Sequence, residues 1–208
     1  PTRRSSDLQR SAHQTGLGAL RLNDLTDINR YCYFVAGVVG ELLSRLYVIY
    51  RPDFNPGAEF HINGLHFGLF LQKVNLLKDQ RSDENEGRYL VPDRQILLAS
   101  LRQNAQGALN YLLSLPGNEK GYRTFCAWSL FLGAASLPWM QQAFEARDDR
   151  KIPRTVTQEL LGEVEAKACD NAALTQGFQQ FLPFLPESDN LVRLSLPLDD
   201  GNWFLEDR

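Results

Sequence analysis

The sequence EFHINGLHFGLFLQKVNLLKDQRSDENEGRYLVP (residues 59–92) decides how this chain folds. It is mostly apolar and predicts a buried helix, yet polar side chains recur in it at intervals of three, four and four residues: Gln72, Asn75, Asp79 and Asp83. At ~100° per residue these four fall within an arc of roughly 80°, so they share one face of the helix. Carboxylates in an apolar setting are unfavourable to bury unless they are paired or bound to a metal. We therefore expect this face to line a polar cavity.

Asp79 and Asp83 are four residues apart, so their carboxylates can approach one hard cation. Mg²⁺ takes oxygen ligands, keeps several waters and is commonly shared with substrate phosphates. Gln72, Asn75, Asp79 and Asp83 are called the polar row below. Arg88 follows just beyond this row, and its guanidinium is suited to binding a phosphate. Two interpretations stay open for the carboxylates alone, a metal site or a helix end in solvent. Gln72 and Asn75 favour the metal site, because a solvated helix end does not account for amides several turns further in.

Two blocks of the sequence resemble segments of the squalene/phytoene synthase family. Residues 67–92, FGLFLQKVNLLKDQRSDENEGRYLVP, resemble the family's second aspartate-rich segment, and residues 31–40, YCYFVAGVVG, resemble its YCxxVAGxVG segment. The tripeptide Leu71-Gln72-Lys73 is more similar to the sequence of squalene synthases than to that of phytoene synthases. The blocks lie in the family's order and at its separation, and the resemblance runs from about residue 16 to about residue 169.

The resemblance implies an all-α fold, the helical bundle of isoprenoid synthases. It also implies a prenyltransferase that condenses two farnesyl diphosphates head to head to presqualene diphosphate and squalene, with Mg²⁺ assisting the loss of diphosphate and NADPH as a candidate reductant. The family's first aspartate-rich motif has no counterpart before Tyr31, so we expect a bundle that is partial at its N-terminus. Three alternatives stay open: a phytoene synthase, a prenyl-diphosphate phosphatase on the same scaffold, and a non-catalytic member that binds a prenyl ligand or a protein partner.

The resemblance further implies which residues carry the activity. The catalytic set is Tyr31, Asp79, Asp83 and Arg88, of which the two aspartates would hold Mg²⁺. The substrate-binding set is Val35, Gly37, Gln72, Asn75, Lys78, Phe125 and Cys126. Tyr31 corresponds to the family's tyrosine implicated in handling the proton lost in the first half-reaction. Lys151 and Arg154 loosely match a basic segment that helps to bind NADPH in squalene synthases, and no glycine-rich dinucleotide loop accompanies them.

Composition fits one domain in a reducing compartment. The chain has 208 residues, of which 43% are hydrophobic, and its net charge of −3 offers no electrostatic argument for nucleic acid binding. The three cysteines are odd in number and far apart, so they indicate neither a disulfide framework nor a metal site. No signal peptide is visible, and the apolar residues 125–140 are too short for a membrane span. We expect a cytoplasmic protein without a transmembrane span, which meets membrane only peripherally to release its product.

Local signals divide the chain into segments. Residues 1–15 are polar and unpatterned, which predicts a flexible segment. We expect the helical domain over residues 16–180 and an irregular tail over residues 181–208. Besides the organising helix we expect helices over 24–50, with Asp24 or Thr26 as its cap, and over 93–115, 119–146 and 157–180. In the first of these, VAGVVG (35–40) consists of small residues, which indicates either close packing against another helix or room for a ligand.

Overall fold

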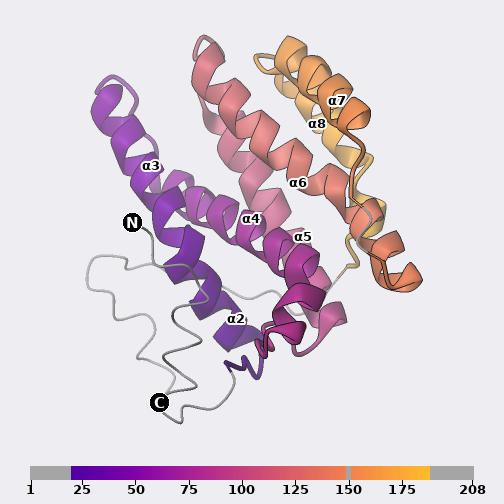
Figure 1. Cartoon of the computed structure of the whole chain (residues 1–208). Coiled ribbons are helices and arrows are strands. Elements are labelled where there is room, and N and C mark those ends of the chain that lie inside the picture. The colour runs from indigo at the N-terminus through magenta and orange to yellow at the C-terminus, as the bar shows by residue number, and fades with distance from the viewer. Residues whose placement is uncertain (1–19, 149–150, 188–208) are drawn as a thin grey trace, which may run out of the picture.

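The computed structural model describes residues 20–148 and 151–187, and in these ranges the chain is built of helices (Figure 1). They are α2 (Leu25–Cys32), the π-helical turn η1 (Tyr33–Gly37), α3 (Val38–Tyr50), α4 (Ala58–Asn85), α5 (Arg94–Ser114), α6 (Lys120–Ala146), α7 (Arg154–Lys167), α8 (Asn171–Gln179) and the 3₁₀ turn η2 (Leu182–Phe184). The expected all-α fold is confirmed. The predictions for residues 1–15 and 188–208 lie outside the described residues.

Aspartate caps begin several of these helices. The carboxylate of Asp24 accepts from the amide of Asp27 at 2.9 Å, and that of Asp93 accepts from two amides of the first turn of α5. Each satisfies donors that have no partner inside the helix. The predicted helix over 157–180 is wrong as a single element, because α7 ends at Lys167 and a separate helix, α8, begins at Asn171. There Asp170 starts a new helix, and its carboxylate accepts from the amide of Ala173 at 3.0 Å.

α4 is the central helix. It packs against α5 on one side and against α3 and η1 on another, and it also contacts α6. Figure 1 shows α3 at one edge of the described helices and α7 and α8 at the opposite edge. Leu69 and Phe70 in the middle of α4 are fully buried, as are Leu97 and Leu101 on α5. The core therefore lies around α4, and the polar row on its C-terminal half is placed by this packing.

α3 and α4 cross at glycines. A Cβ atom on Gly40 would lie 2.1 Å from the carbonyl oxygen of Gly64, and one on Gly68 would lie 2.3 Å from that of Ala36. No side chain fits at these distances, so the two backbones approach as closely as they do only because both positions are glycine. Of the two interpretations of the VAGVVG segment, close helix packing is the one that the structure bears out.

α2, η1 and α3 form one continuous helix, Leu25–Tyr50, which confirms the expected helix over 24–50 but adds a π-helical turn within it. Its 26 residues are long and apolar enough to cross a membrane, and 28% of its most apolar window is buried. Core helices of soluble proteins and signal sequences have the same length and composition, so this is weak evidence for a span. The expectation of a chain without a membrane-spanning helix stays a prediction.

Arg123 is a fully buried side chain that joins three helices. Its Nε donates to the carbonyl oxygen of Ala168 at 2.7 Å, where α7 ends, and one Nη donates to that of Leu112 at 3.1 Å. It also bonds the carbonyl oxygen of Leu115 and the side-chain oxygen of Asn171. The guanidinium thus adds a partner for carbonyl oxygens at the ends of α5 and α7, of which that of Leu112 also accepts from the amide of Leu115.

Candidate functional site

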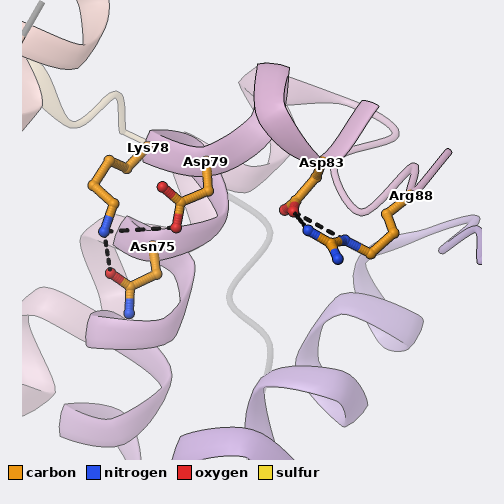
Figure 2. Close-up of polar contacts among 5 residues, drawn as sticks. All are labelled: Asn75, Lys78, Asp79, Asp83 and Arg88. Carbon is orange, nitrogen blue, oxygen red and sulfur yellow. Dashed lines mark hydrogen bonds and ion pairs between the residues drawn. The ribbon is translucent and has the colours of Figure 1, made fainter. Parts of the chain in front are cut away.

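The end of α4 folds back so that Asp83 pairs with Arg88 (Figure 2). Gly87 has a positive φ of 78°, which allows the turn, and the amide of Arg88 donates to the carbonyl oxygen of Asp83 at 2.8 Å. The Arg88 Nε donates to Asp83 Oδ1 at 3.0 Å, and a second guanidinium nitrogen bonds the same oxygen. Both side chains are largely buried. Burial disfavours the charged guanidinium, but the hydrogen bond to Asp83 and the negative charges of Asp83 and Glu86 together outweigh it and raise the pKa of Arg88.

Tyr31, on the last turn of α2, lies close enough to this pair to respond to its charges. Burial raises the pKa of Tyr31, the negative charge of Asp83 raises it further, and the positive charge of Arg88 opposes both. The segment after α4 is tied to the segment before α2, since the amide of Leu22 donates to the carbonyl oxygen of Tyr89 at 3.0 Å. Two of the four predicted catalytic residues are therefore in direct contact, and the charges of that pair act on a third, Tyr31.

The fourth, Asp79, lies on the more exposed side of the same helix end (Figure 2). Its carboxylate is 3.6 Å from the ammonium of Lys78, which donates to Asn75 Oδ1 at 3.2 Å. Gln72, further along the row, is half-buried. The row predicted to line a polar cavity is thus divided: Asp83 is buried and paired, whereas Asn75 and Asp79 are exposed. Angular position on the helix was predicted from spacing, but burial also depends on where along its length α4 meets a neighbour.

A cavity of about 740 Å³ lies beside the exposed end of the row, between the C-terminal ends of α4 and α6. Lys78, Asp79 and Arg81 line it from α4, and Lys151 lines it from the segment before α7. The Arg81 guanidinium donates to the carbonyl oxygen of Arg147 and joins the two helix ends. Lys151, predicted from its resemblance to a cofactor-binding segment, is therefore brought next to the predicted site.

The other predicted residues are spread over the described structure. Arg154, the first residue of α7, is exposed and is not in the described lining of this cavity. Val35 is exposed on η1, while Gly37 is buried against Leu65 of α4.

On α6, Cys126 and Phe125 point to different environments. Cys126 is buried, and burial raises its pKa to about 12, so its thiol is neutral. Phe125 is exposed and stacks on Tyr122, with ring centroids 6.2 Å apart.

The described residues hold no group of three or more histidines, cysteines or carboxylates that could bind a metal. Mg²⁺ does not require such a group, because it is often held by one or two carboxylates together with substrate phosphates and water. Asp79 and Asp83 are one helical turn apart and carry the hard oxygen donors that such a site uses, although they face different partners, Lys78 and Arg88. Asp83 would have to share its carboxylate between the metal and Arg88.

The structure adds a residue that sequence reasoning missed, Lys73, which is 1% exposed. Its ammonium donates to Ser100 Oγ at 3.1 Å and to Asn104 Oδ1 at 2.6 Å, and the Asn104 amide is 2.8 Å from His66 Nδ1. Burial lowers the pKa of Lys73 to about 8, which the nearby thiol of Cys32 partly opposes. The signal was in the sequence, because the residues three and four positions away on either side are all apolar: Leu69, Phe70, Leu76 and Leu77.

Comparison with known proteins identifies the family. The family model for squalene/phytoene synthase matches residues 3–170. Squalene synthase of Mycosarcoma maydis is 41% identical over 80 residues, which is 37% of this chain and 14% of that protein. Squalene synthase R6 of a Phoma species is 35% identical over 97 residues, or 41% of this chain and 22% of that protein. The rat (Rattus norvegicus) squalene synthase is 36% identical over 85 residues, or 38% of this chain and 20% of that protein.

In each of these three pairs the match spans less than a quarter of the relative's length. The family match nevertheless covers most of this chain, including α2 to α6, and contains the Asp83–Arg88 turn, Tyr31 and the exposed Asp79. This chain belongs to the squalene/phytoene synthase family.

Proposed function

We propose that this chain carries part of the active site of a squalene synthase-like prenyltransferase, which joins two farnesyl diphosphates head to head with loss of diphosphate. The observation that carries the proposal is the grouping of Tyr31, Asp83 and Arg88 at the end of α4, with Asp79 one turn away. The match to squalene synthases of three organisms supports it. The products, substrates and partners of the whole protein are part of the proposal.

Asp79 and Asp83 would hold Mg²⁺, which supplies positive charge to the diphosphate oxygens as the carbon–oxygen bond breaks. Arg88 is preorganised for the same task, because its guanidinium is already held by Asp83 and Glu86. Lys78 would add a second positive charge from the exposed side. Gln72 and Asn75 would orient water or diphosphate oxygens along the row.

Tyr31 would move the proton that the condensation releases. The raised pKa of Tyr31 keeps its phenol neutral at physiological pH. A neutral phenol can accept a proton from the reacting carbon only while it passes its own proton to a diphosphate oxygen, so we assign Tyr31 a relay role. The influence of the Asp83 and Arg88 charges on Tyr31 supports a relay near the leaving group.

The second half of the reaction would take a hydride from NADPH. The cavity beside Lys78 and Asp79 supports a place for its phosphates, and Lys151 on the cavity wall is the residue that we propose to contact them. Arg154 is kept as a second candidate on the grounds of the resemblance alone. Water exclusion from the site would protect the carbocation from quenching.

A second candidate function is binding of a prenyl diphosphate without turnover. The exposure of Asp79 and the engagement of Asp83 by Arg88 favour it, because one carboxylate is open to solvent and the other is already paired. The two candidates differ in product formation but share the binding residues.

The test is to incubate the chain with Mg²⁺ and farnesyl diphosphate, with and without NADPH, and to measure both binding and product. We expect Mg²⁺-dependent binding, and presqualene diphosphate or squalene if turnover occurs. Asp79→Asn should weaken Mg²⁺-dependent binding at least tenfold, since it removes a charged metal ligand. Glu163→Gln, an exposed carboxylate on α7, is the matched control and should leave binding unchanged.

Binding without product would select the second candidate. Absence of Mg²⁺-dependent binding, or an Asp79→Asn variant that binds as tightly as the unmodified chain, would contradict both candidates.

A further inference from the structure

Arg88 and Asp83 each occupy the group with which the other would bind a ligand (Figure 2). The Nε of Arg88 and one Nη both bond Asp83 Oδ1, so the edge of the guanidinium that can bind two phosphate oxygens already faces a carboxylate. In the same contact, the carboxylate that would bind Mg²⁺ in the proposed function already has a cationic partner. Neither side chain can take its ligand unless this pair separates, at least in part.

Asp79, the other proposed metal ligand, is held more weakly. The Lys78 ammonium lies 3.6 Å from its carboxylate, and the two side chains are 45% and 51% exposed. Pairs of this kind contribute little, because solvent and salt screen them. The Arg88 and Asp83 side chains are 16% and 11% exposed, so their attraction is screened much less. A divalent cation that bridges the two carboxylates therefore has to overcome mainly the attraction between Asp83 and Arg88.

The backbone around Arg88 is anchored on both sides. Its amide donates to the carbonyl oxygen of Asp83 at 2.8 Å, and the next residue, Tyr89, makes two backbone hydrogen bonds with the segment before α2 (residues 20–22). Glu86 Oε2 lies 2.9 Å from a further guanidinium nitrogen, Nη1. The Arg88 side chain can thus leave Asp83 by rotation about its own bonds, while the backbone and Glu86 keep it at the end of α4.

We propose that Arg88 is an internal cation that competes with Mg²⁺ for Asp83, and that diphosphate removes this competition by binding the guanidinium. The inference rests on the proposed function and adds to it how the site is regulated. Metal alone has to displace Arg88, and diphosphate alone has to approach a guanidinium that two carboxylates already neutralise. When both bind, the metal faces the carboxylates and the guanidinium faces the phosphate oxygens. Metal and diphosphate therefore bind with positive coupling, for which about 5- to 150-fold is typical.

The first test measures metal binding by the whole chain without an anion. Mn²⁺ is the probe, because it takes the same oxygen ligands as Mg²⁺ and its free ion can be counted by electron paramagnetic resonance. We expect Arg88→Met to bind Mn²⁺ at least about fivefold more tightly than the unmodified chain, since the competing cation is gone. Arg81→Met removes the same charge from the same end of α4, where Arg81 bonds a carbonyl oxygen. This control should stay within about twofold of the unmodified chain, because exposed charges are screened.

The second test measures binding of inorganic pyrophosphate in excess Mg²⁺ by calorimetry. Arg88→Met should now weaken binding at least about tenfold, because the phosphate oxygens lose a bidentate partner. Magnesium pyrophosphate forms in solution to the same extent with every variant, so this step cancels in the comparison. Opposite signs from one substitution distinguish the exchange from a purely structural ion pair, whose loss would not tighten metal binding.

Arg88→Gln gives a second reading should Arg88→Met not fold, because its amide can still donate to Asp83 but carries no charge. It should show the same two signs, and circular dichroism establishes that each variant is folded. Mn²⁺ binding that is unchanged or weaker in the folded Arg88 variants would overturn the exchange, while pyrophosphate binding with Mg²⁺ would leave the proposed function standing. Absence of both Mn²⁺ and magnesium pyrophosphate binding in the unmodified chain would overturn the proposed function, and this inference with it.

Discussion

Lys73 illustrates how one residue can be held in an unfavourable state by its surroundings. Its ammonium is buried between α4 and α5, and no carboxylate pairs with it in the described part of the chain. Burying a charge without a counter-charge costs several kcal/mol unless hydrogen bonds replace the lost water. Ser100 and Asn104 supply two of the three acceptors that an ammonium can use, so the charge is only partly compensated.

This arrangement predicts how stability depends on pH. The pKa of Lys73 is about 8 in the folded chain and 10.5 as its ordinary value, so between these pH values the unfolded chain holds a proton that the folded chain has lost. Stability therefore rises with pH across this window, and below pH 8 the contribution of Lys73 is constant. Cys32, whose pKa is raised by burial to about 12, also titrates close to this pH range. His66, whose pKa is lowered by burial to about 4, is already neutral throughout it.

The comparison of the unmodified chain with Lys73→Met isolates the lysine. In urea unfolding from pH 7 to pH 10.5, we expect the free energy of unfolding of the unmodified chain to gain about 1–3 kcal/mol relative to that of Lys73→Met. Lys167→Met, at an exposed lysine on α7, should give a curve parallel to that of the unmodified chain. If the stability curve of Lys73→Met also runs parallel to that of the unmodified chain, Lys73 does not titrate in this window.

At the scale of elements, the crossing of α3 and α4 determines where the polar row lies. The two backbones approach at Gly40, Gly64 and Gly68, and α4 is then sandwiched between α3 and α5. Interiors are close-packed, so added atoms at such a contact force neighbouring groups to move. The position of Tyr31 relative to Asp83 depends on this crossing, because the two residues belong to the two helices that meet there.

Two glycine substitutions test the crossing with opposite expected signs. Gly68→Ala should destabilise the chain by about 1–3 kcal/mol or more, because its Cβ would overlap the carbonyl oxygen of Ala36. Gly162→Ala, in α7 with no atom within 4 Å of the added Cβ, should stabilise it by up to about 1 kcal/mol. Chemical denaturation measures both. A Gly68→Ala variant as stable as Gly162→Ala would mean that the helices do not approach at this glycine.

Helix positions were predictable from local chemistry, whereas burial was not. Asp24 and Asp93 mark helix starts because a carboxylate beside free amides is a local signal. The π-helical turn escaped prediction, and so did the break after α7, although Asp170 marks the start of α8 by the same local signal.

The candidate site was predictable to a similar degree. The resemblance selected Tyr31, Asp83 and Arg88, which the fold brings near one another. Spacing alone put Asp79 on the same face as Asp83 but could not tell that one is exposed and the other buried, because that difference comes from the chain that folds back after Gly87.

At the scale of the whole molecule, Arg123 connects parts that are distant in sequence. One guanidinium holds the C-terminal end of α5, the end of α7 and the start of α8. Without it, α7 would keep its apolar contacts with α6 and the hydrogen bond from Trp128 to the carbonyl oxygen of Leu161, and α8 the hydrogen bond from Asn171 to that of Leu113. The group is fully buried and makes several hydrogen bonds to carbonyl oxygens, so removal would leave acceptors buried without partners.

Arg123→Met should therefore lower the free energy of unfolding by about 3–5 kcal/mol, since it removes several buried hydrogen bonds at once. Arg154→Met, at an exposed arginine on α7, should change it by less than about 0.5 kcal/mol. Urea unfolding followed by circular dichroism measures both, and hydrogen exchange should show α7 and α8 opening first in the Arg123→Met variant. Equal stability of the two variants would contradict the connecting role.

The π-helical turn at Tyr33–Gly37 has a consequence for how this helix can evolve. Such a turn is equivalent to one residue inserted into an α-helix. Because the turn absorbs one extra residue, deleting a residue there would restore an ordinary helix and leave Tyr31 and Gly40 on the faces that they now occupy. Deleting a further residue between the turn and Gly40 has no such outlet and would rotate Gly40 away from α4 by about 100°. This helix can therefore lose one residue at Tyr33–Gly37, but no second one before Gly40, without separating the phenol from the glycine contact.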